Sequence, residues 1–564
     1  MSSLRSERPL SSSAGRSWAL VAILIVAAAL RLYGIDFGLP ALLDPDELIF
    51  IGGAHQLLAS GNFNPGWFGH PATTTIYVVG LIAASVLGSG MVTGEFAGPE
   101  AFARAMFLDP GIVVLPTRIV MAGFGVACVA LTARLARRLG GGRTSVLVAG
   151  AMMAVNPVHI AWSQVIRSDI MALAFLLLAA LASLTVLERG GRRAHVLACL
   201  FTALAITSKW PFAVAFLSLA GALALRMQRG GGINPKTAPR LAMQWAASGV
   251  LVVAFVLAIS PYLLLDYPTL LSNLQGEAKV AHLGQTQDGL WGNLVFYLSQ
   301  PLWRGLGPVG AVLALAGLVL TRRNAAFWTV VGLPAAVILV IILSQAIAWD
   351  RWVLPLFPML CITAGFAAER LFAALRSHPP IIRAAATLVF AAVLTGPPLA
   401  ATYSAARERI VDDRRLATDW ALAHLPAGAS LMVEHFAFDL VDSPFPIVFP
   451  IGTAGCLDAR KVLRGQINYK EVDSLRGGQS NLDYAAVPAA KQSSCRTDFA
   501  ILTEHARYAA ERERFPVGAE RYRALIARGR VIARFHPARG EIGGRPEVIV
   551  LDLRTGRGVR AAKP

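Results

Sequence analysis

Long apolar stretches alternate with short polar turns up to about residue 403, where the pattern changes. About 20 apolar residues cross a bilayer as a helix, because backbone groups in lipid must bond to one another. The predicted fold is therefore a polytopic α-helical membrane protein with about 11 to 13 transmembrane helices. The apolar segments run over residues 18–34, 72–92, 111–133, 145–162, 169–187, 195–207, 211–226, 241–264, 305–320, 326–348, 352–368 and 382–403.

Two of these regions bear on the topology. The first segment runs into Arg31 with no small-residue cleavage motif behind it, so we expect a membrane anchor rather than a cleaved signal peptide. Segments 195–207 and 211–226 are short, and residues 208–211 separate them. They are either two half-crossings or one broken helix, and the pattern leaves both open.

From residue 404 onward, charged residues and short strand-like runs replace the apolar stretches. Strand and helix patterns alternate there, which predicts a small soluble α/β domain. We divide the chain into a transmembrane domain of residues 1–403, with outer loops at 35–71 and 263–304, and a C-terminal α/β domain of residues 404–564. The predicted strands lie at residues 430–434, 498–504, 530–535 and 547–553, and the predicted helices at 412–425 and 518–529.

The composition supports a membrane protein and explains its charge. The chain has 564 residues, 55% of them hydrophobic and 15% charged, and a formal net charge of +18. The high hydrophobic content excludes a disordered chain. The excess of basic residues makes nucleic acid a candidate partner. However, 19 of the 27 Lys and Arg residues before residue 404 fall in the N-terminal segment and five of the connecting turns, and 12 of the 15 acids lie elsewhere. The positive-inside rule then predicts a cytoplasmic N-terminus and an extracytoplasmic C-terminal domain, and leaves the crossings between residues 72 and 143 open.

The first outer loop carries three acids, Asp44, Asp46 and Glu47, around Pro45. A helix start explains Asp44 as a cap and Glu47 as its reciprocal partner, but it does not require Asp46. His70 follows in the same loop, just before an apolar segment, where it is either an interfacial histidine or a ligand. The loop is therefore either a capped helix start or part of a polar site.

Further polar residues fall at the predicted outer ends of apolar segments. Asp169 opens one segment two residues after Arg167, and Lys209 interrupts another. Ionisable groups at that depth indicate function, although an ion pair, a helix cap or a snorkelling lysine would explain them too. The remaining candidates are Tyr262, Asp266 and His282 near the long outer loop and Arg351 between two tryptophans.

These features direct carboxylates, a few cations and aromatic rings to one face of a helical bundle. A carboxylate base activates an acceptor hydroxyl, and cations or a metal take up the charge that develops on a phosphate leaving group. The pattern therefore favours glycosyl transfer from a lipid phosphate. A polysaccharide polymerase or ligase shares this chemistry. A receptor, or a lipid or solute transporter, is a further alternative, although the sequence shows neither mid-segment acids nor an inverted repeat.

Several short motifs follow one another along the chain, and they are Pro45-Asp46-Glu47, Leu57-Leu58-Ala59-Ser60-Gly61, Gly69-His70-Pro71, Arg167-Ser168-Asp169, Ser208-Lys209-Trp210, Ser260-Pro261-Tyr262, Arg351 with Leu354-Pro355, and Asp419-Trp420. With them the chain resembles the GT-C type integral-membrane glycosyltransferases. The resemblance is to the bacterial branch related to protein O-mannosyltransferases and lipid A aminoarabinose transferases, and it extends over about the whole chain.

The resemblance implies a hexosyl- or pentosyltransferase that inverts the sugar and takes it from a polyprenyl-phosphate donor. It implies that Asp46 and Asp169 are catalytic and that Glu47 supports Asp46. Some relatives bind a divalent cation near the first-loop motif. Here its candidate ligands are Glu47 and His70, although His70 stands where some relatives carry Glu. The candidates for binding substrate or phosphate are Arg167, Lys209, Tyr262, Asp266, His282 and Arg351.

The expected setting is the bacterial inner membrane, with the reaction at the extracytoplasmic face. The expected partners are the polyprenyl-phosphate-linked sugar, membrane lipids and an unknown lipid, protein or polysaccharide acceptor, but no nucleic acid. Apart from the divalent cation, we expect no cofactor. Cys456 and Cys495 both lie in the predicted outer domain, where the compartment is oxidising, so we predict a disulfide between them.

Overall fold

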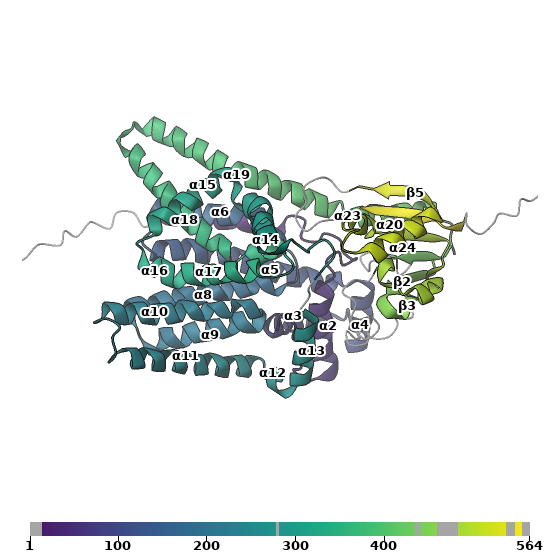
Figure 1. The fold of residues 1–564 in the computed structure, drawn as a ribbon, viewed down its shortest axis with the longest axis horizontal. Helices are drawn as coiled ribbons and strands as arrows, with labels where there is room; N and C mark the ends of the chain where they lie inside the picture. The colour runs from purple at the N-terminus through teal and green to yellow at the C-terminus, as the bar shows by residue number, and fades with distance from the viewer. Residues whose placement is uncertain are drawn as a thin grey trace, which may run out of the picture.

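A computed structural model describes residues 14–277, 281–434, 439–440, 443–458, 483–536 and 547–554. It has two parts, a bundle of long helices and a smaller α/β domain attached to one end of that bundle (Figure 1). A six-stranded sheet forms the centre of the α/β domain. The predicted fold class, a polytopic helical protein with a C-terminal α/β domain, is confirmed.

All twelve predicted apolar segments are helical. Nine helices in the described ranges are long and apolar enough to cross a bilayer, or ten if α6 and α7, bent by 59°, form one span. This is fewer than predicted because the apolar part of α1 (Trp18–Leu32) and the 17-residue α9 are short. The bundle helices are α1 Ala14–Leu32, α2 Glu47–Ser60, α3 Thr73–Thr93, α4 Pro99–Leu108, α5 Gly111–Arg138, α6 Arg143–Val155, α7 Pro157–Ser163, α8 Ser168–Arg189, α9 Arg192–Ser208, α10 Ala215–Arg229, α11 Ala238–Ile259, α12 Tyr262–Leu265, α13 Tyr267–Glu277, α14 Gly289–Tyr297, α15 Trp303–Thr321, α16 Ala325–Phe327, α17 Leu333–Leu343, α18 Leu356–Ala374 and α19 Pro380–Ile410.

The short segments on either side of Lys209 form two separate helices. Lys209, directly after α9, bonds to Asp169 in the first turn of α8. Arg226, in the last turn of α10, donates to the carbonyl oxygens of Val186 and Leu187 near the end of α8. Both helices therefore run alongside α8 from end to end, in opposite directions. The two interpretations from the sequence, half-crossings or one broken helix, are both wrong.

The contacts of Arg118 resolve the region between residues 72 and 143. Arg118, two turns into α5, donates to the carbonyl oxygens of Ile35 and Phe37, just after α1. The chain is therefore at the same end of the bundle when α1 finishes and when α5 begins. It follows that α2, α3 and α4 together make no net crossing, although α3 alone is long and apolar enough for one.

Glycines let helices approach closely inside the bundle. A Cβ on Gly317 of α15 would lie 1.9 Å from the carbonyl oxygen of Thr363 in α18, and one on Gly365 would lie 2.5 Å from that of Ser145 in α6. Small residues at helix crossings allow such packing in membranes. Among the candidate spans, α8 has the largest buried share. The first turn of α8, which contains Asp169, is therefore enclosed by neighbouring helices.

The C-terminal sheet has the strand order β3-β2-β1-β4-β6-β5. β1 is parallel to β2 and β4, whereas the β2–β3, β4–β6 and β5–β6 pairs are antiparallel. The four predicted strands and two predicted helices are present, and β2, β3 and the short helix α23 were not predicted. The elements are β1 Leu431–Val433, β2 Ile447–Ile451, β3 Gly455–Asp458, β4 Phe499–Leu502, β5 Arg530–Phe535, β6 Val548–Asp552, α20 Asp413–His424, α23 His505–Ala510 and α24 Pro516–Ala527.

Three further predictions can be compared with the structure. Residue 404, the predicted domain boundary, lies inside α19. The long outer loop ends near residue 288 rather than 304, because the apolar helical stretch that includes α14 and α15 starts at Gly289. The hydropathy of residues 289–304 is interrupted by polar residues, and this hid the start of the helix from the sequence pattern. The predicted disulfide between Cys456 and Cys495 is present.

Candidate active site

The first-loop acids are oriented by a tight turn that precedes α2. The backbone N–H of Asp46 donates to Oδ1 of Asp44 at 3.0 Å, so the Asp44 side chain closes the turn. Asp46 occupies the position before the helix but forms no capping bond with its side chain. A cap therefore does not explain Asp46, and its carboxylate is turned toward another partner.

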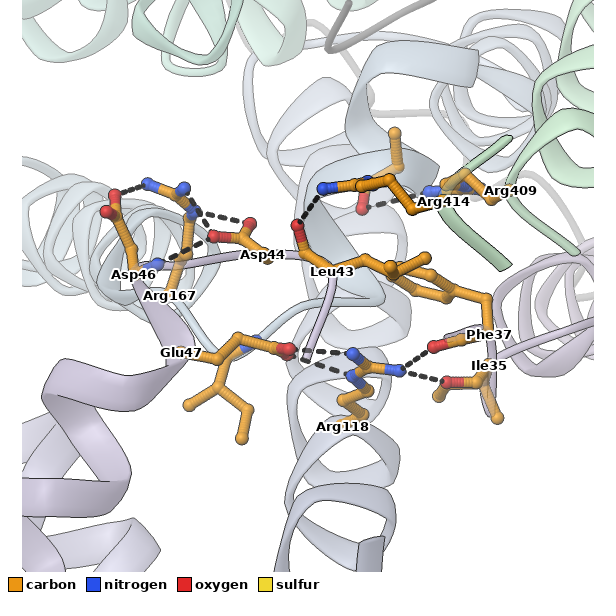
Figure 2. A network of polar contacts seen from close by, with 12 residues as sticks. Ile35, Phe37, Leu43, Asp44, Asp46, Glu47, Arg118, Arg167, Arg409 and Arg414 are labelled. Carbon is orange, nitrogen blue, oxygen red and sulfur yellow. Dashed lines mark hydrogen bonds and ion pairs between the residues drawn. The ribbon is translucent and has the colours of Figure 1, made fainter. Parts of the chain in front are cut away.

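That partner is Arg167, which precedes α8 and bridges Asp44 and Asp46 (Figure 2). Its Nε and Nη2 donate to the two carboxylate oxygens of Asp44 at 3.0 and 2.7 Å, and its Nη1 donates to Asp46. Burial alone would raise the pKa of Asp46, but the nearby guanidinium groups of Arg167 and Arg351 outweigh it and lower the pKa. Asp46 is therefore ionised at neutral pH.

A second ion pair joins α8 to the end of α9. Nζ of Lys209 lies 2.5 Å from a carboxylate oxygen of Asp169, and both side chains are buried. The segment before α3 lies against this pair, because the N–H of Trp210 donates to the carbonyl oxygen of His70 at 2.6 Å. The structure thus brings together residues that lie far apart in the sequence, since Arg167 is 121 residues from Asp46 and Lys209 is 40 residues from Asp169.

Arg351 lies in a short turn before α18, next to the two ion pairs. We refer to these residues together as the cluster, which consists of Asp44, Asp46, Arg167, Asp169, Lys209 and Arg351. The guanidinium of Arg351 lies over the rings of Trp349 and Trp162, with its Cζ 4.3 and 5.3 Å from the ring centroids. It interacts electrostatically with Asp46 and Asp169. Within the described chain, its buried Nε and Nη1 have no hydrogen-bond acceptor. A buried guanidinium with unsatisfied donors beside two carboxylates is suited to an anionic ligand.

His70 lies at the edge of the same cluster. Its ring contacts that of Trp67 at a centroid distance of 4.9 Å. Burial and the neighbouring charge of Lys209 lower the pKa of His70 to about 3, so the imidazole is neutral. Its buried Nδ1 has no partner among the residues that the structure describes.

Glu47 lies apart from this cluster in a buried ion pair of its own (Figure 2). Arg118 donates to both of its carboxylate oxygens, at 2.9 and 2.6 Å, and the N–H of Ile166 donates at 2.9 Å. Both side chains have an exposed fraction of 0%. Glu47 therefore holds the first loop against α5 through Arg118. Both of its carboxylate oxygens already accept hydrogen bonds, and this does not fit the predicted role of metal ligand.

The predicted divalent-cation site has no further support in the geometry. No group of three or more His, Cys, Asp and Glu side chains that could hold a metal ion occurs in the described part of the chain. His70 is the remaining candidate ligand, and its ring faces Trp67. We derive no step through a metal.

Three other predicted residues lie around the cluster. Oδ2 of Asp266 accepts a hydrogen bond from Asn64 at 2.9 Å, and this ties the loop before α3 to the turn that contains Tyr262. His282 packs its ring against Trp349 at 5.2 Å between centroids. The structure therefore places His282 behind an aromatic ring that contacts Arg351, and places Tyr262 and Asp266 at the side of the His70 loop.

Two residues in this region were missed by the sequence analysis. Arg118 is a charged residue inside an apolar segment, a signal that could have been noticed. Trp162 lies between the guanidinium groups of Arg167 and Arg351, with the Cζ of Arg167 5.0 Å from its ring centroid. A tryptophan at the end of an apolar helix is so common that the sequence offers no signal for this role.

Known proteins give two kinds of match. Residues 75–272 match the family of dolichyl-phosphate-mannose-protein mannosyltransferases, a stretch that includes Asp169 and Lys209. A comparison with curated proteins gives no match. Among solved structures, ArnT from Cupriavidus metallidurans in the apo state is similar with a TM-score of 0.52 and 15% sequence identity, over 96% of this chain and 98% of that one.

The same ArnT bound to undecaprenyl phosphate matches with a TM-score of 0.52 and 15% identity, over 98% of this chain and all of that chain. The chain has the GT-C fold. The resemblance to GT-C type membrane glycosyltransferases is therefore confirmed. Arg351 and the ion pairs lie at the end of the bundle nearest the α/β domain, since Arg351 contacts Trp349, Trp349 contacts His282, and the neighbouring Leu283 packs in the core of that domain. At the same end, Arg414 of α20 donates to the carbonyl oxygen of Leu43 (Figure 2).

Proposed function

We propose that the protein transfers a hexosyl or pentosyl group from a polyprenyl-phosphate donor to an acceptor hydroxyl at the extracytoplasmic face of a bacterial inner membrane. The observation that carries this proposal is Arg351, whose buried Nε and Nη1 have no acceptor among the described residues. It lies next to two carboxylates, so the site offers an anion-binding group and a base together. A phosphate on a lipid is an anion that reaches such a site from the membrane.

The charges of the cluster divide into paired and unpaired groups. Arg167 is held by Asp44 and Asp46, and Lys209 is held by Asp169. Among the described residues, the guanidinium of Arg351 has aromatic rings around it rather than an ion-pair partner. Burial raises the pKa of Asp350, its neighbour in sequence, which weakens that residue as a counter-ion. Arg351 is therefore the cation whose N–H groups, unsatisfied among the described residues, can bind the donor phosphate, and Lys209, which interacts with Arg351 electrostatically, shares that phosphate.

The exposed fractions of the carboxylates assign their roles. The side chain of Asp46 is 32% exposed, whereas that of Asp169 is 4% exposed. An incoming acceptor reaches Asp46 more easily. In a single displacement, the acceptor oxygen forms a bond to the anomeric carbon and its proton passes to Asp46. The bond from that carbon to the phosphate oxygen breaks, and the phosphate leaves with the electron pair, stabilised by Arg351 and Lys209.

Two further observations support the proposal. The GT-C fold is shared with ArnT, one structure of which is bound to undecaprenyl phosphate. The basic turns of the sequence lie on the face opposite the first outer loop, as expected if the cluster is extracytoplasmic. The acceptor is a hydroxyl of a lipid, a protein or a polysaccharide, and the fold of the C-terminal domain does not select among them.

The test uses purified protein in vesicles with radiolabelled undecaprenyl-phosphate hexoses and pentoses, and measures release of the lipid phosphate. Wild type is expected to release it, and Asp46→Asn is expected to lose at least about a hundredfold in rate, since a general base contributes that much. Asp169→Asn is also expected to lose rate, because Asp169 holds Lys209, which stabilises the leaving phosphate. Asp36→Asn, the same change at an exposed acid of the same loop, is the control and is expected to remain active. Full activity of both site variants would contradict the assignment. Movement of intact donor across the vesicle without cleavage would indicate a transporter instead.

A further inference from the structure

We propose that the C-terminal domain fixes the position of Arg351 through residues 281–288, which we call the connecting segment. The proposal rests on the proposed function only for the role of Arg351 as phosphate ligand. His282 and Leu283 in this segment are then positioning residues, because they act on the donor through Arg351.

One side of the connecting segment is part of the C-terminal domain. Leu283 is 3% exposed and packs in the same apolar core as Leu502 and Tyr508. The N–H of Gly284 donates to Glu511 at 2.5 Å, directly after α23. Arg514 donates to the carbonyl oxygen of Thr286 at 2.6 Å, and it also pairs with Asp288. The domain thus holds the segment by an apolar anchor at Leu283 and by polar bonds to the residues that follow it.

The other side of the segment contacts the residues before Arg351. The N–H of Ala348 donates to the carbonyl oxygen of Gln285 at 2.9 Å. The ring of His282 packs against that of Trp349 at 5.2 Å between centroids. The ring of Trp349 in turn lies 4.3 Å from the Cζ of Arg351. The anchor in the C-terminal core and the aromatic contact that supports the guanidinium therefore belong to adjacent residues, Leu283 and His282.

The segment is stiff enough to transmit this position. The hydroxyl of Thr286 accepts a hydrogen bond from the N–H of His282 at 2.9 Å and donates one to its carbonyl oxygen at 2.9 Å. The N–H of Gln285 also donates to that carbonyl oxygen, at 3.0 Å. These bonds close a compact turn around Leu283. Movement of Leu283 therefore also moves His282, and the ring of His282 then no longer supports the ring of Trp349.

This arrangement makes binding of the donor phosphate depend on a domain that lies outside the bundle. Arg351 has unsatisfied N–H groups that gain a ligand only in one orientation, since a guanidinium binds phosphate through directed hydrogen bonds. Loosening the connecting segment is expected to weaken phosphate binding while leaving the helices of the bundle folded.

The first test measures binding of phosphorus-radiolabelled undecaprenyl phosphate to full-length protein in nanodiscs. Leu283→Ala and His282→Ala are expected to raise the Kd about tenfold, the effect of losing one charge-assisted hydrogen bond. His282→Phe keeps a ring against Trp349 and is expected to restore most of the binding. Leu290→Ala changes a leucine that is 61% exposed in the nearby helix α14 and serves as the matched control.

A double variant separates positioning from general damage. In an Arg351→Lys background, Leu283→Ala is expected to change the Kd by less than about twofold, because both substitutions act on the same contact. Independent, multiplying effects on the Kd would overturn the proposal. So would wild-type binding by Leu283→Ala together with weak binding by Arg351→Lys.

The second test measures the accessibility of the Arg351 guanidinium in the absence of lipid phosphate. Phenylglyoxal modifies accessible guanidinium groups, and peptide mass spectrometry gives the rate at Arg351. We expect Leu283→Ala and His282→Ala to increase this rate several-fold, and Leu290→Ala to leave it unchanged. Equal rates in all variants would overturn the proposal whether or not the protein binds undecaprenyl phosphate. Faster modification in the two variants, with no lipid binding by wild type, would support the positioning role and count against the proposed function alone.

Discussion

Nζ of Lys209 lies 2.5 Å from a carboxylate oxygen of Asp169, and the two side chains are only 7% and 4% exposed. They come from neighbouring helices, α9 and α8, at the end of the bundle next to the first loop. Removing one member of a buried pair leaves the other charge without compensation. A phosphate that binds here therefore enters a site in which Lys209 already has a carboxylate partner, whereas Arg351 has buried N–H groups without an acceptor among the described residues.

This pairing predicts opposite effects of the two neutral substitutions on lipid binding. Asp169→Asn leaves Lys209 free to hold a phosphate, so the Kd for undecaprenyl phosphate is expected to stay within about threefold of wild type or to fall. Lys209→Met removes a cation and leaves the charge of Asp169, which repels the phosphate. Its Kd is expected to rise roughly tenfold to hundredfold, the range for one hydrogen bond to a charged group.

The measurement is equilibrium binding of the radiolabelled lipid phosphate in nanodiscs. The control is Lys236→Met, the same substitution at an exposed lysine in a turn on the opposite face. Weaker binding by Asp169→Asn than by Lys209→Met would contradict the assignment of Lys209 to the phosphate.

The residues of this cluster could be predicted from the sequence because each one interrupts an apolar pattern. Asp169 and Lys209 stand at the ends of apolar segments, and Asp46 is not needed by the helix that follows it. The sequence could not show which acid pairs with which base. Arg167 bridges Asp44 and Asp46 over more than a hundred residues of chain, and such pairing follows from helix packing rather than from spacing.

The partner of Glu47 shows where sequence reasoning failed. Spacing suggested a capping pair, which is a local interaction, and the family resemblance implied a metal ligand. The structure instead gives Glu47 a fully buried partner 71 residues away, Arg118, on another helix. The topology of residues 72–143 was open for the same reason, since hydropathy does not distinguish an apolar helix that crosses from one that does not. The contacts of Arg118 decide both points.

The buried pair of Arg118 and Glu47 predicts a large loss of stability when it is broken. Arg118→Met leaves a carboxylate enclosed by apolar groups and is expected to cost about 3–5 kcal/mol. Adding Glu47→Gln removes the stranded charge and keeps an acceptor for the N–H of Ile166, so the double variant is expected to be more stable than Arg118→Met alone. Thermal unfolding in detergent measures both.

A matched control comes from the exposed pair of Arg523 and Glu520, whose side chains are 68% and 63% exposed. Arg523→Met is expected to leave the Tm unchanged, because exposed ion pairs contribute little. A Tm for the double variant as low as that of Arg118→Met would contradict the stranded-charge explanation.

The disulfide between Cys456 and Cys495 predicts redox-dependent stability of the C-terminal domain. It closes a loop with a sequence separation of 39 residues. The chain-entropy model gives a stabilisation of about 4 kcal/mol for a loop of that length. The double variant Cys456→Ser with Cys495→Ser is expected to unfold at a lower temperature than wild type. A reducing agent is expected to lower the Tm of wild type but not that of the double variant, and an equal effect on both would show that the reducing agent does not act through this disulfide.

The buried acids of the C-terminal domain predict a loss of stability as the pH rises. Burial raises the pKa of Glu434 to about 7, and burial together with the charge of Glu434 raises that of Asp483 to about 8. In the unfolded chain both lose their protons near pH 4. Between about pH 4 and pH 8 the folded domain therefore binds more protons than the unfolded chain, so its stability falls as the pH rises, by at most about 1.4 kcal/mol per pH unit for each extra proton.

Asp483→Asn removes one of these protons from the balance and keeps an oxygen that can accept the bond from the N–H of Ala486. The Tm of this variant is expected to depend less on pH than that of wild type between pH 5 and pH 9, and to exceed it at pH 9. Thermal unfolding of the full-length protein across this range measures the slope. Glu520→Gln, at an exposed acid of the same domain, is the control and is expected to keep the wild-type slope. An unchanged slope in Asp483→Asn would show that this carboxyl is already ionised in the folded domain, and the pH dependence would then have to come from Glu434.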